Sequence, residues 1–458
     1  MQAAFRTYQS LADKLRPLLC RPIDLPTGPE VSADPGTPAK SPLVATDWIL
    51  ALVVGIVGFT FAFIGSGLMD SYVAHMDMFN RYFNGDSPLV WENMVSFGGD
   101  HHRNNVHPLF SLIAAPPTVI VNSILGGEPE MGVRVVTSFV AGFGIATMFI
   151  LFRLMKLALI DALMFTALVG ISAGSMFWFI IPETFTFGAV SIALAFVLVA
   201  WSEFRDIGPK WHIANAISTI AYTVTNAMFG AIAILVSFPR KQAIRVGSIA
   251  VGIFVVLWIT QKLVFPSSGH LLDPREEVKF LHLPLPGATS SFFINTIVVE
   301  EIEKIAADTD HGTKVPVLRL NSPVQQTFPE PTAWFIGGAV LWCVIFAIGV
   351  LALIAVPQHP RLRFLLGSTL ILQLILHLIY GDDPFLYAAH FVPLLIAIAA
   401  FSTLTKFRPI ILGLTAMLLV CAWVNNVNEF NNSMSFFDEH FSNHLKVVES
   451  LEASTTGN

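Results

Sequence analysis

The sequence predicts an all-α polytopic membrane protein, and three observations carry that prediction. Hydrophobic residues make up 54 % of the 458 residues and charged residues only 13 %, and the mean hydropathy is +0.66. An ordinary soluble domain carries about 25 % charged residues. Apolar stretches long enough to span a bilayer, about 20 residues, recur along the chain. The composition therefore disfavours a soluble enzyme and a disordered scaffold.

Charge and cysteine usage exclude further classes. The net charge is −6 and no stretch is strongly basic, so we expect no nucleic-acid partner. Cys20, Cys343 and Cys421 lie far apart. Neither a disulfide framework nor a cysteine metal site is therefore expected.

The apolar stretches predict about eleven transmembrane segments. The stretch 211–238 is interrupted by Asn226 and Gly230, so we divide it into two. The stretch 109–126 is also apolar, but counting it as a span would place Arg153 and Lys156 outside, so we expect a helix on the outer surface. The predicted spans lie at about 48–68, 135–155, 158–180, 185–203, 211–226, 227–238, 244–264, 333–356, 363–380, 386–404 and 409–427.

The charge of the short loops predicts the orientation. Eleven Lys and Arg residues fall in loops on one side, and the short turns near 179–184 and 381–385 contain none. The positive side is expected to be cytosolic. The predicted domains are a disordered cytosolic tail (1–46), a transmembrane domain (47–427) with outer loops 69–133 and 265–332, and a non-cytosolic amphipathic tail (428–458).

Carboxylates near the outer ends of spans are candidate catalytic groups, because ionisable residues there are costly. Asp70 follows the first span, and Asp77 lies seven residues later, about two helical turns. A partly desolvated carboxylate suits proton transfer from a hydroxyl; the alternative is a helix-ending Asp in water. Glu183 lies in a short outer turn. It either caps the following helix or faces Asp70 in an active site.

The first outer loop concentrates further polar residues. Asp100, His101, His102, Arg103 and His107 lie within eight residues. Asp100, His101 and His107 could ligate a divalent metal, although their spacing matches no standard motif. The alternative is contact with a polar substrate, or a structural role in the loop.

Later candidates lie at other outer ends. His390 lies about one turn into a span, after Asp382 in the preceding turn, and Lys262 ends the 244–264 span. Such groups could bind a substrate phosphate at the membrane surface. The alternative for Lys262 is snorkelling to the interface.

These motifs together resemble the GT-C fold polytopic glycosyltransferases, and the layout is similar to protein O-mannosyltransferases and the lipid A aminoarabinose transferase. The shared features are an acidic residue after the first span (Asp70), a long first outer loop with His107 before Pro108, a second acidic residue in the next short outer turn (Glu183), and a later long outer loop.

The sequence departs from the family pattern at two positions. His390 stands where many relatives have Arg in an Arg-Tyr-x-x-Pro stretch, and Ser71 stands where a second acidic residue is usual.

The resemblance implies transfer of a sugar from a polyprenyl-phosphate donor to a glycan, lipid or protein acceptor on the non-cytosolic face, with inversion. Asp70 would be the general base, with Glu183 and His107 positioning the acceptor or sugar. A cation would stabilise the leaving phosphate, supplied by His390, Lys262, Arg103 or a metal.

The expected location is a bacterial inner membrane, among its lipids. Two rivals stay open. A transporter or flippase of a lipid-linked saccharide would need ionisable residues in mid-span, and the predicted spans are nearly free of them. A catalytically silent scaffold would use its outer loops to bind a partner.

Overall fold

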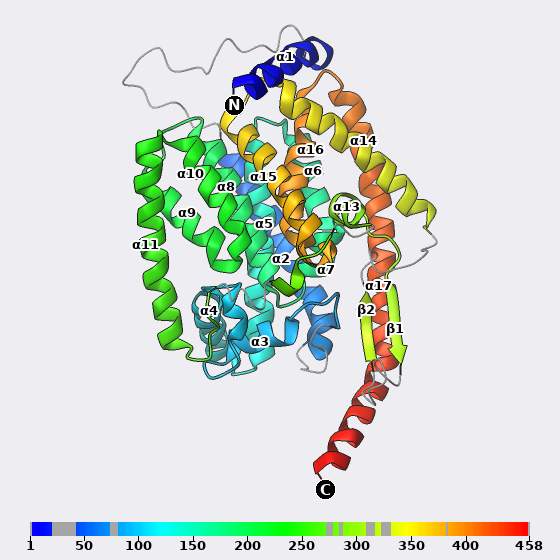
Figure 1. Ribbon diagram of the computed structural model, residues 1–458. Coiled ribbons are helices and arrows are strands. Elements are labelled where there is room, and N and C mark those ends of the chain that lie inside the picture. Colours follow the sequence, from blue (N-terminus) through cyan, green and yellow to red (C-terminus); the bar gives the residue numbers. More distant parts are fainter. Residues whose placement is uncertain are drawn as a thin grey trace.

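The computed structural model describes residues 2–20, 43–73, 81–271, 278–283, 287–307, 317–321, 331–381 and 383–456. They form a bundle of apolar helices with the N-terminus at one end and the C-terminus at the other (Figure 1). The α-helices are α1 (Gln2–Leu19), α2 (Ala45–Val73), α3 (Ser87–Val95), α4 (Phe110–Leu125), α5 (Pro129–Leu154), α6 (Leu159–Ile171), α7 (Ala173–Trp178), α8 (Thr184–Ser202), α9 (Pro209–Tyr222), α10 (Ala227–Ser237), α11 (Arg240–Val264), α13 (Ala288–Ser290), α14 (Ala333–Ala355), α15 (Pro360–Ile379), α16 (Ala388–Ala400) and α17 (Arg408–Thr456). Shorter helical turns are η2 (His102–Asn105), η3 (Val224–Asn226), η4 (Val278–Phe280), η5 (Ser291–Asn295), η7 (Pro384–Tyr387) and η8 (Phe401–Leu404), and the strands are β1 (Glu303–Ala307) and β2 (Val317–Asn321).

The class predicted from composition is confirmed: the chain is a helical, polytopic membrane protein. Within the described residues, eight helices are long and apolar enough to cross a membrane. The predicted spans 158–180, 211–226 and 227–238 instead form shorter helices, namely α6 followed by α7, then α9, then α10, so the count of eleven stays a prediction. The eight helices cover Ala45–Met69, Pro129–Leu154, Thr184–Ser202, Arg240–Val264, Ala333–Ala355, Pro360–Ile379, Pro384–Leu404 and Arg408–Val447.

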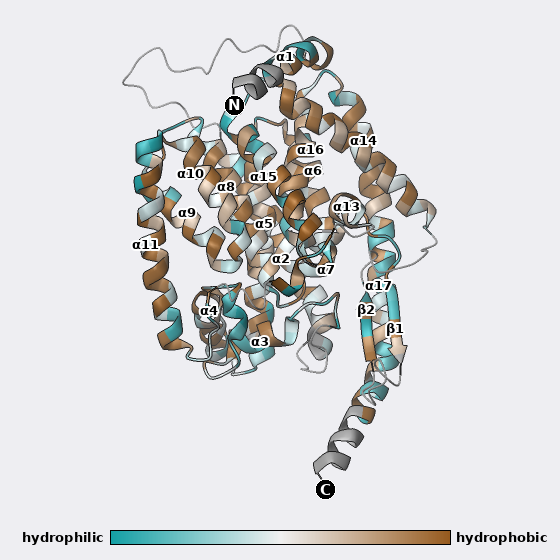
Figure 2. Cartoon of the chain, in the orientation of Figure 1, coloured by the Kyte–Doolittle hydropathy of each residue, from teal (hydrophilic) through white to brown (hydrophobic). Residues whose placement is uncertain are grey.

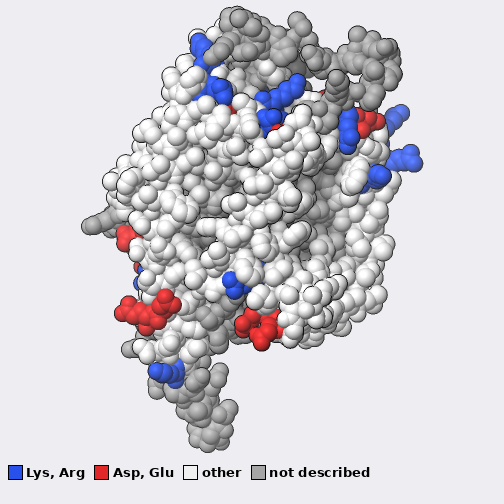
Figure 3. Space-filling model, turned by 180° about the vertical axis from the view of Figure 1, so that it is seen from behind, with Lys and Arg blue, Asp and Glu red and all other residues white. Residues whose placement is uncertain are grey.

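Lys and Arg gather at one end of the bundle, which we call the basic end. Figure 3 shows them toward the end where α1 lies, above a broad uncharged band, and Figure 2 shows hydrophobic residues along the helices between two more hydrophilic ends. Ion pairs join neighbouring helices there: Arg153 Nε lies 2.6 Å from Asp47, and Arg408 binds Asp161 through two contacts of 2.8 Å. These pairs neutralise buried carboxylates where the spans begin.

The opposite end, which we call the loop end, holds α3, α4, the β-hairpin and the far part of α17 (Figure 1). Helix α4 packs beside α3 and the first turns of α5, and its predicted place on the outer membrane surface stays a prediction. The strands β1 and β2 pair antiparallel. They are a small departure from the all-α prediction, and they lie against α17.

The N-terminal segment differs from the predicted tail, whereas the C-terminal tail is helical, as its apolar spacing predicted, and is continuous with the last span. Residues 2–19 form α1 instead of a disordered segment, because Ala12 and Leu19 are buried and Arg16 Nε donates to Ala355 O at 3.3 Å. The predicted boundary at 427 does not interrupt α17, which continues into the tail. Phe437 is fully buried there, because the apolar face of the tail packs on the outer segments.

A break between α6 and α7 brings α7 into position beside the loop end. Ser172 interrupts the helix, which leaves backbone groups without helical partners. Asn426 of α17 satisfies one of them by donating from Nδ2 to Ile171 O at 2.9 Å, and its Oδ1 accepts from Val299 N at 3.0 Å. A buried polar side chain thus holds the broken helix against the 287–302 segment.

The helices α9 and α10 form a short hairpin that starts at the basic end. Their 14 and 11 residues correspond to about 21 and 17 Å, less than the roughly 30 Å of a hydrocarbon core. The tip of the hairpin is therefore recessed below the loop end. The segment after η2 reaches down to it, with Leu109 N donating to Ala221 O at 3.0 Å.

Candidate functional site

Glu183 lies at the centre of a polar cluster beneath the loop end. It precedes α8 and is 1 % exposed. Its Oε1 accepts from Ser87 Oγ at 3.1 Å, and its Oε2 accepts from Thr184 N at 3.3 Å. Burial raises the pKa of Glu183, and the nearby charge of Asp86 raises it further. The residue therefore caps α8 and is also a carboxyl group that holds a proton more tightly than usual.

Asp86 and Arg103 complete the centre of this cluster. Arg103 Nε lies 2.6 Å from Asp86 Oδ2, and Glu183 and Tyr387 also interact electrostatically with the guanidinium. Burial raises the pKa of Asp86, and the charge of Arg103 opposes that rise. Two carboxyl groups thus share one arginine, an arrangement that suits acid–base chemistry beside a bound anion.

A strained turn places Asp86 in the cluster. Phe83 and Asn84 have φ values of 48° and 59°, in the left-handed region that bulky residues avoid. Phe83 is nonetheless fully buried, with its ring 5.6 Å from that of Phe177 and 5.2 Å from that of Phe385. Aromatic packing therefore holds the backbone in the conformation that begins α3 at Asp86.

His107 connects this cluster to the tip of the α9–α10 hairpin. Its Nδ1 lies 2.5 Å from Tyr222 O and its Nε2 lies 3.4 Å from Thr184 Oγ1. Because a carbonyl can only accept, Nδ1 carries the proton and Nε2 is the acceptor. Burial, aided by the charge of Arg103, lowers the pKa of His107 to about 3. It is therefore a neutral hydrogen-bonding group.

His390 lies deeper, inside the helix bundle, and is 2 % exposed. Its Nε2 lies 3.5 Å from Asn226 Nδ2. A Cβ at Gly188 would approach within 2.2 Å of the same Nε2. Because the Arg103 side chain is 33 % exposed, Arg103 is more accessible than His390 to a substrate phosphate.

His101 and Lys262 belong to a different polar cluster, which ties the first outer loop to the end of α11. His101 binds Ser111 Oγ at 2.8 Å through Nδ1 and Ser96 O at 3.0 Å through Nε2. Lys262 Nζ donates to Ser268 O at 2.6 Å. These bonds give both residues structural roles in this conformation.

The metal candidates are not brought together. Asp100 pairs with His102 at 2.9 Å on the surface, whereas both ring nitrogens of His101 are hydrogen-bonded and His107 faces the Glu183 cluster. Across the part of the chain that the structure describes, no group of three or more His, Cys, Asp or Glu residues could hold a metal ion.

For three predicted site residues, the structure does not describe the side chain. Asp77 and Asp382 fall outside the described residues. Asp70 belongs to the last turn of α2, at the loop end, but its side chain also lies outside the described set. Their roles stay predictions.

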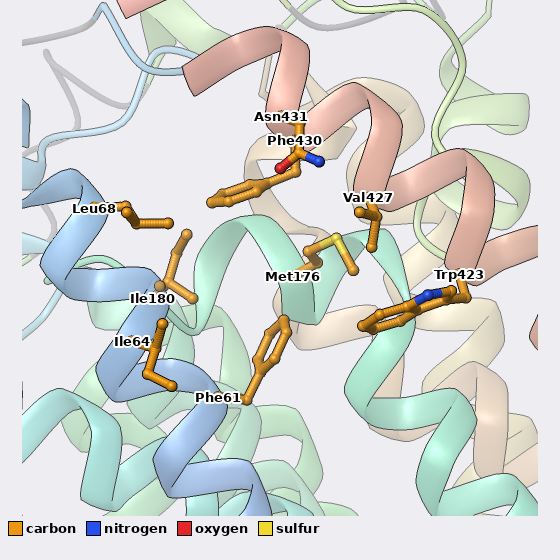
Figure 4. A pocket seen from close by; sticks show the side chains of 10 residues that line it. Phe61, Ile64, Leu68, Met176, Ile180, Trp423, Val427, Phe430 and Asn431 are labelled. Atoms are coloured by element: carbon orange, nitrogen blue, oxygen red, sulfur yellow. The ribbon is translucent and has the colours of Figure 1, made fainter. Parts of the chain in front are cut away.

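An apolar groove opens on the side of the bundle between α2 and α17, with α7 as its floor (Figure 4). Its volume is about 220 Å³. The α2 span that forms one wall is mostly exposed, so the groove faces the membrane. Lining residues are Phe61, Ile64, Gly65, Leu68, Met176, Ile180, Trp423, Val427, Phe430 and Asn431.

Helix α7 lies beside both this groove and the polar cluster. Met176 of α7 and Ile180, two residues after the helix ends, line the groove. Trp178 lies on the cluster side, with its ring 5.4 Å from that of Phe185, and a Cβ at Gly85 would lie 3.0 Å from Glu183 Oε1 and 3.3 Å from Trp178. Helix α7 thus contributes side chains both to the apolar groove and to the surroundings of the buried carboxyl groups.

The sequence reasoning missed Asp86. Its only local signal is the run Asp86-Ser87-Pro88, which is typical of a helix N-terminus and does not indicate catalysis. A lipid-facing groove between spans was expected, but the sequence did not indicate its walls, because α2 and α17 lie far apart in the chain. Arg103, His107 and Glu183 were candidates, and the structure places them together.

No known protein-family model matches the chain, and no curated protein shows significant similarity to it. The fold and the site therefore define the class directly: an integral, helical membrane protein with a buried acid–base cluster beneath its loop end.

Proposed function

We propose that this protein is a membrane glycosyltransferase that moves a sugar from a polyprenyl-phosphate donor to a glycan, lipid or protein acceptor, with inversion. The loop end would be the non-cytosolic face, by the charge bias of the loops. One observation carries the proposal: Asp86, Glu183 and Arg103 form a cluster with two buried carboxyl groups close to α7, and Met176 of α7 lines a membrane-facing apolar groove.

The groove supports a lipid-linked donor. Nearly all its lining is apolar, and it lies beside the α2 span, so it suits an isoprenoid chain that enters sideways from the bilayer. The chain's phosphate would lie toward the loop end, where Asn431 ends the groove. Arg103, which is 33 % exposed, would bind that phosphate and stabilise the charge that develops on it as the sugar leaves.

A carboxylate would accept the proton of the acceptor hydroxyl. Asp70 is the base that the family resemblance implies, and Asp86 is the base that the described cluster favours, with Glu183 beside it. His107 is neutral and hydrogen-bonded on both nitrogens, so it would position the segment that carries Arg103.

The decisive assay is sugar transfer by the purified full chain in lipid nanodiscs, from polyprenyl-phosphate sugars to a panel of acceptors. Asp70→Asn and Asp86→Asn are compared with Glu439→Gln, an exposed carboxylate on α17. Loss of the base should slow transfer by about 10²–10⁴-fold, whereas the control should match the wild type. Transfer that survives both Asn substitutions would reject carboxylate base catalysis here.

A flippase for a lipid-linked saccharide is the second candidate. His377 and His390 are almost fully buried within two of the apolar spans, which is unusual in a membrane interior. Movement of a labelled polyprenyl-linked sugar between vesicle leaflets, without chemical transfer, would favour this alternative.

A further inference from the structure

Helix α1 has an apolar face that the rest of the protein covers only in part. At about 100° per residue, the Leu and Ala side chains of its second half fall within an arc of about 120°. One side of this arc is buried: Ala12 and Leu19 are 5 % and 6 % exposed, and α1 packs along α14. The other side, which we call the outer stripe, consists of Leu11, Leu15 and Leu18. Leu11 and Leu18 are 44 % and 61 % exposed, so the stripe is turned away from the bundle.

Two hydrogen bonds fix α1 at the level where two membrane spans end. Arg16 Nε donates to Ala355 O at 3.3 Å, and Ala355 is the last residue of the α14 span. Leu19 O accepts from Lys406 N at 2.8 Å, two residues before the α17 span begins at Arg408. Figure 1 shows α1 lying across this end of the bundle. The second half of α1 therefore lies at the boundary of the spans and not in the water beyond it.

The span on which α1 docks has an apolar surface that reaches this boundary. Only 39 % of the α14 span is buried, and Leu351, one turn before Ala355, is itself exposed. In a membrane protein such a surface faces lipid. The outer stripe begins at the level where this lipid-facing surface ends, so the bilayer is the medium that can remove its leucines from water.

Cations flank the apolar face of α1 on both sides. By the same helical geometry, Lys14 and Arg16 lie about 40° beyond its two edges, and Asp13 lies on the opposite face. Lys14 is exposed, and Arg16 lies 3.6 Å from Asp13. A long basic side chain can lay its stem along apolar surface and place its charge among headgroups. Since further Lys and Arg residues gather at this end (Figure 3), the charge of the surface complements anionic headgroups.

We infer that α1 is an interfacial helix that binds the surface of an anionic bilayer leaflet. The outer stripe enters the boundary between headgroups and acyl chains, as amphipathic helices do to a depth of about 5–10 Å, and Lys14 binds a lipid phosphate. Because α1 is bonded to the end of α14 and to the segment before α17, this contact ties both spans to the membrane surface. The inference is independent of the proposed sugar transfer.

The test is fluorescence quenching of the full chain in lipid nanodiscs, with a bimane label attached to Leu18→Cys. The native cysteines are first replaced, by Cys20→Ser, Cys343→Ser and Cys421→Ser, so that the label has one site. A phosphatidylcholine with a nitroxide near its headgroup quenches a label that contacts the bilayer, and acrylamide quenches a label in water. We expect strong quenching by the nitroxide lipid and weak quenching by acrylamide.

The matched control is a label on the opposite face of the same helix. The Asp13 side chain is 71 % exposed, so Asp13→Cys should show the reverse pattern, with strong quenching by acrylamide and weak quenching by the nitroxide lipid. Leu11→Cys is a second position on the outer stripe should Leu18→Cys fail to fold, and it should behave as position 18 does.

The selection of headgroups is measured with the label at position 18, by comparing nitroxide-labelled phosphatidylglycerol with nitroxide-labelled phosphatidylcholine. The anionic lipid should quench at a roughly fivefold lower mole fraction, the effect of one Lys beside an anionic surface. Lys14→Gln should remove most of this preference and leave quenching by phosphatidylcholine in place. Lys241→Gln, exposed in the first turn of α11, should leave the preference unchanged.

Three outcomes would overturn the inference. Acrylamide quenching at position 18 as strong as at position 13 would place the outer stripe in water. Weak quenching by both agents at position 18 would mean that a protein segment or a second copy of the chain covers the stripe. Equal quenching by the two lipids, or a preference that survives Lys14→Gln, would overturn the binding of anionic headgroups by α1. Each result stands whether or not the protein transfers a sugar.

Discussion

Asn426 should be essential for the stability of the broken helix that carries the site. Its side chain is fully buried. Oδ1 accepts from Val299 N at 3.0 Å, and Nδ2 donates to Ile171 O at 2.9 Å and to Ile297 O at 2.8 Å. Asn426→Leu has nearly the same volume, so it removes these three bonds and creates little cavity.

The cost follows from which backbone groups lose their partners. Ile297 O keeps a bond from Ala173 N at 3.1 Å, whereas Val299 N–H and Ile171 C=O lose their side-chain partner. Each buried orphan costs about 1–3 kcal/mol, so the substitution should destabilise by about 2–6 kcal/mol. That loss corresponds to a drop in melting temperature on the order of 5 °C or more.

The measurement is thermal unfolding in detergent by intrinsic fluorescence, with hydrogen exchange across Ser172 and Ala173. The control is Asn431→Leu, an exposed position on the same helix, for which a change within about 0.5 kcal/mol is expected. Exchange should accelerate at the α6–α7 break in Asn426→Leu alone. If Asn426→Leu and Asn431→Leu have the same melting temperature, the buried amide of Asn426 does not stabilise the α6–α7 break.

Three further outcomes are expected. Gly188→Ala would place a Cβ 2.2 Å from His390 Nε2 and should destabilise the protein by roughly 1–3 kcal/mol. Adding His390→Ala removes the clashing ring and should restore the melting temperature. If the double variant melts no higher than Gly188→Ala, the clash is not the cause. Burial raises the pKa of Glu183, so the folded protein holds a proton that the unfolded chain releases, and stability falls as pH rises between the two pKa values. The melting temperature of Glu183→Gln relative to wild type should thus increase from about pH 5 to about pH 8, and a constant difference would exclude the shift. Ile64→Trp should fill the groove and slow sugar transfer at least about tenfold without unfolding the protein. Val251→Trp, on the exposed face of α11, is the control and should leave the transfer rate unchanged. Equal transfer rates in the two variants would show that the groove does not bind the donor.

The sequence alone predicted the class of fold and most helix positions. Hydropathy and charge are properties of local windows, so they identify spans and an alternation of basic and uncharged loops. The interruption at Asn226 predicted a divided segment, and the structure has two helices there. Local patterns missed α1 and the short strands, because docking on α14 and α17 stabilises them.

The grouping of the site residues depended on tertiary structure. From the sequence, Asp86 is typical of a helix N-terminus. In the folded chain it lies 2.6 Å from Arg103, and its charge raises the pKa of Glu183. The sequence predicts His101 and Lys262 as site residues. In the structure, their hydrogen bonds connect the first outer loop to the end of α11.

The sequence by itself therefore determined that this chain is a helical membrane protein with polar residues concentrated at one end. Tertiary structure decided which of those residues share a cluster, and it created the groove between α2 and α17. The physical reason is that burial and pKa depend on neighbours distant in the sequence, whereas hydrophobicity and helix periodicity depend on residues that adjoin one another.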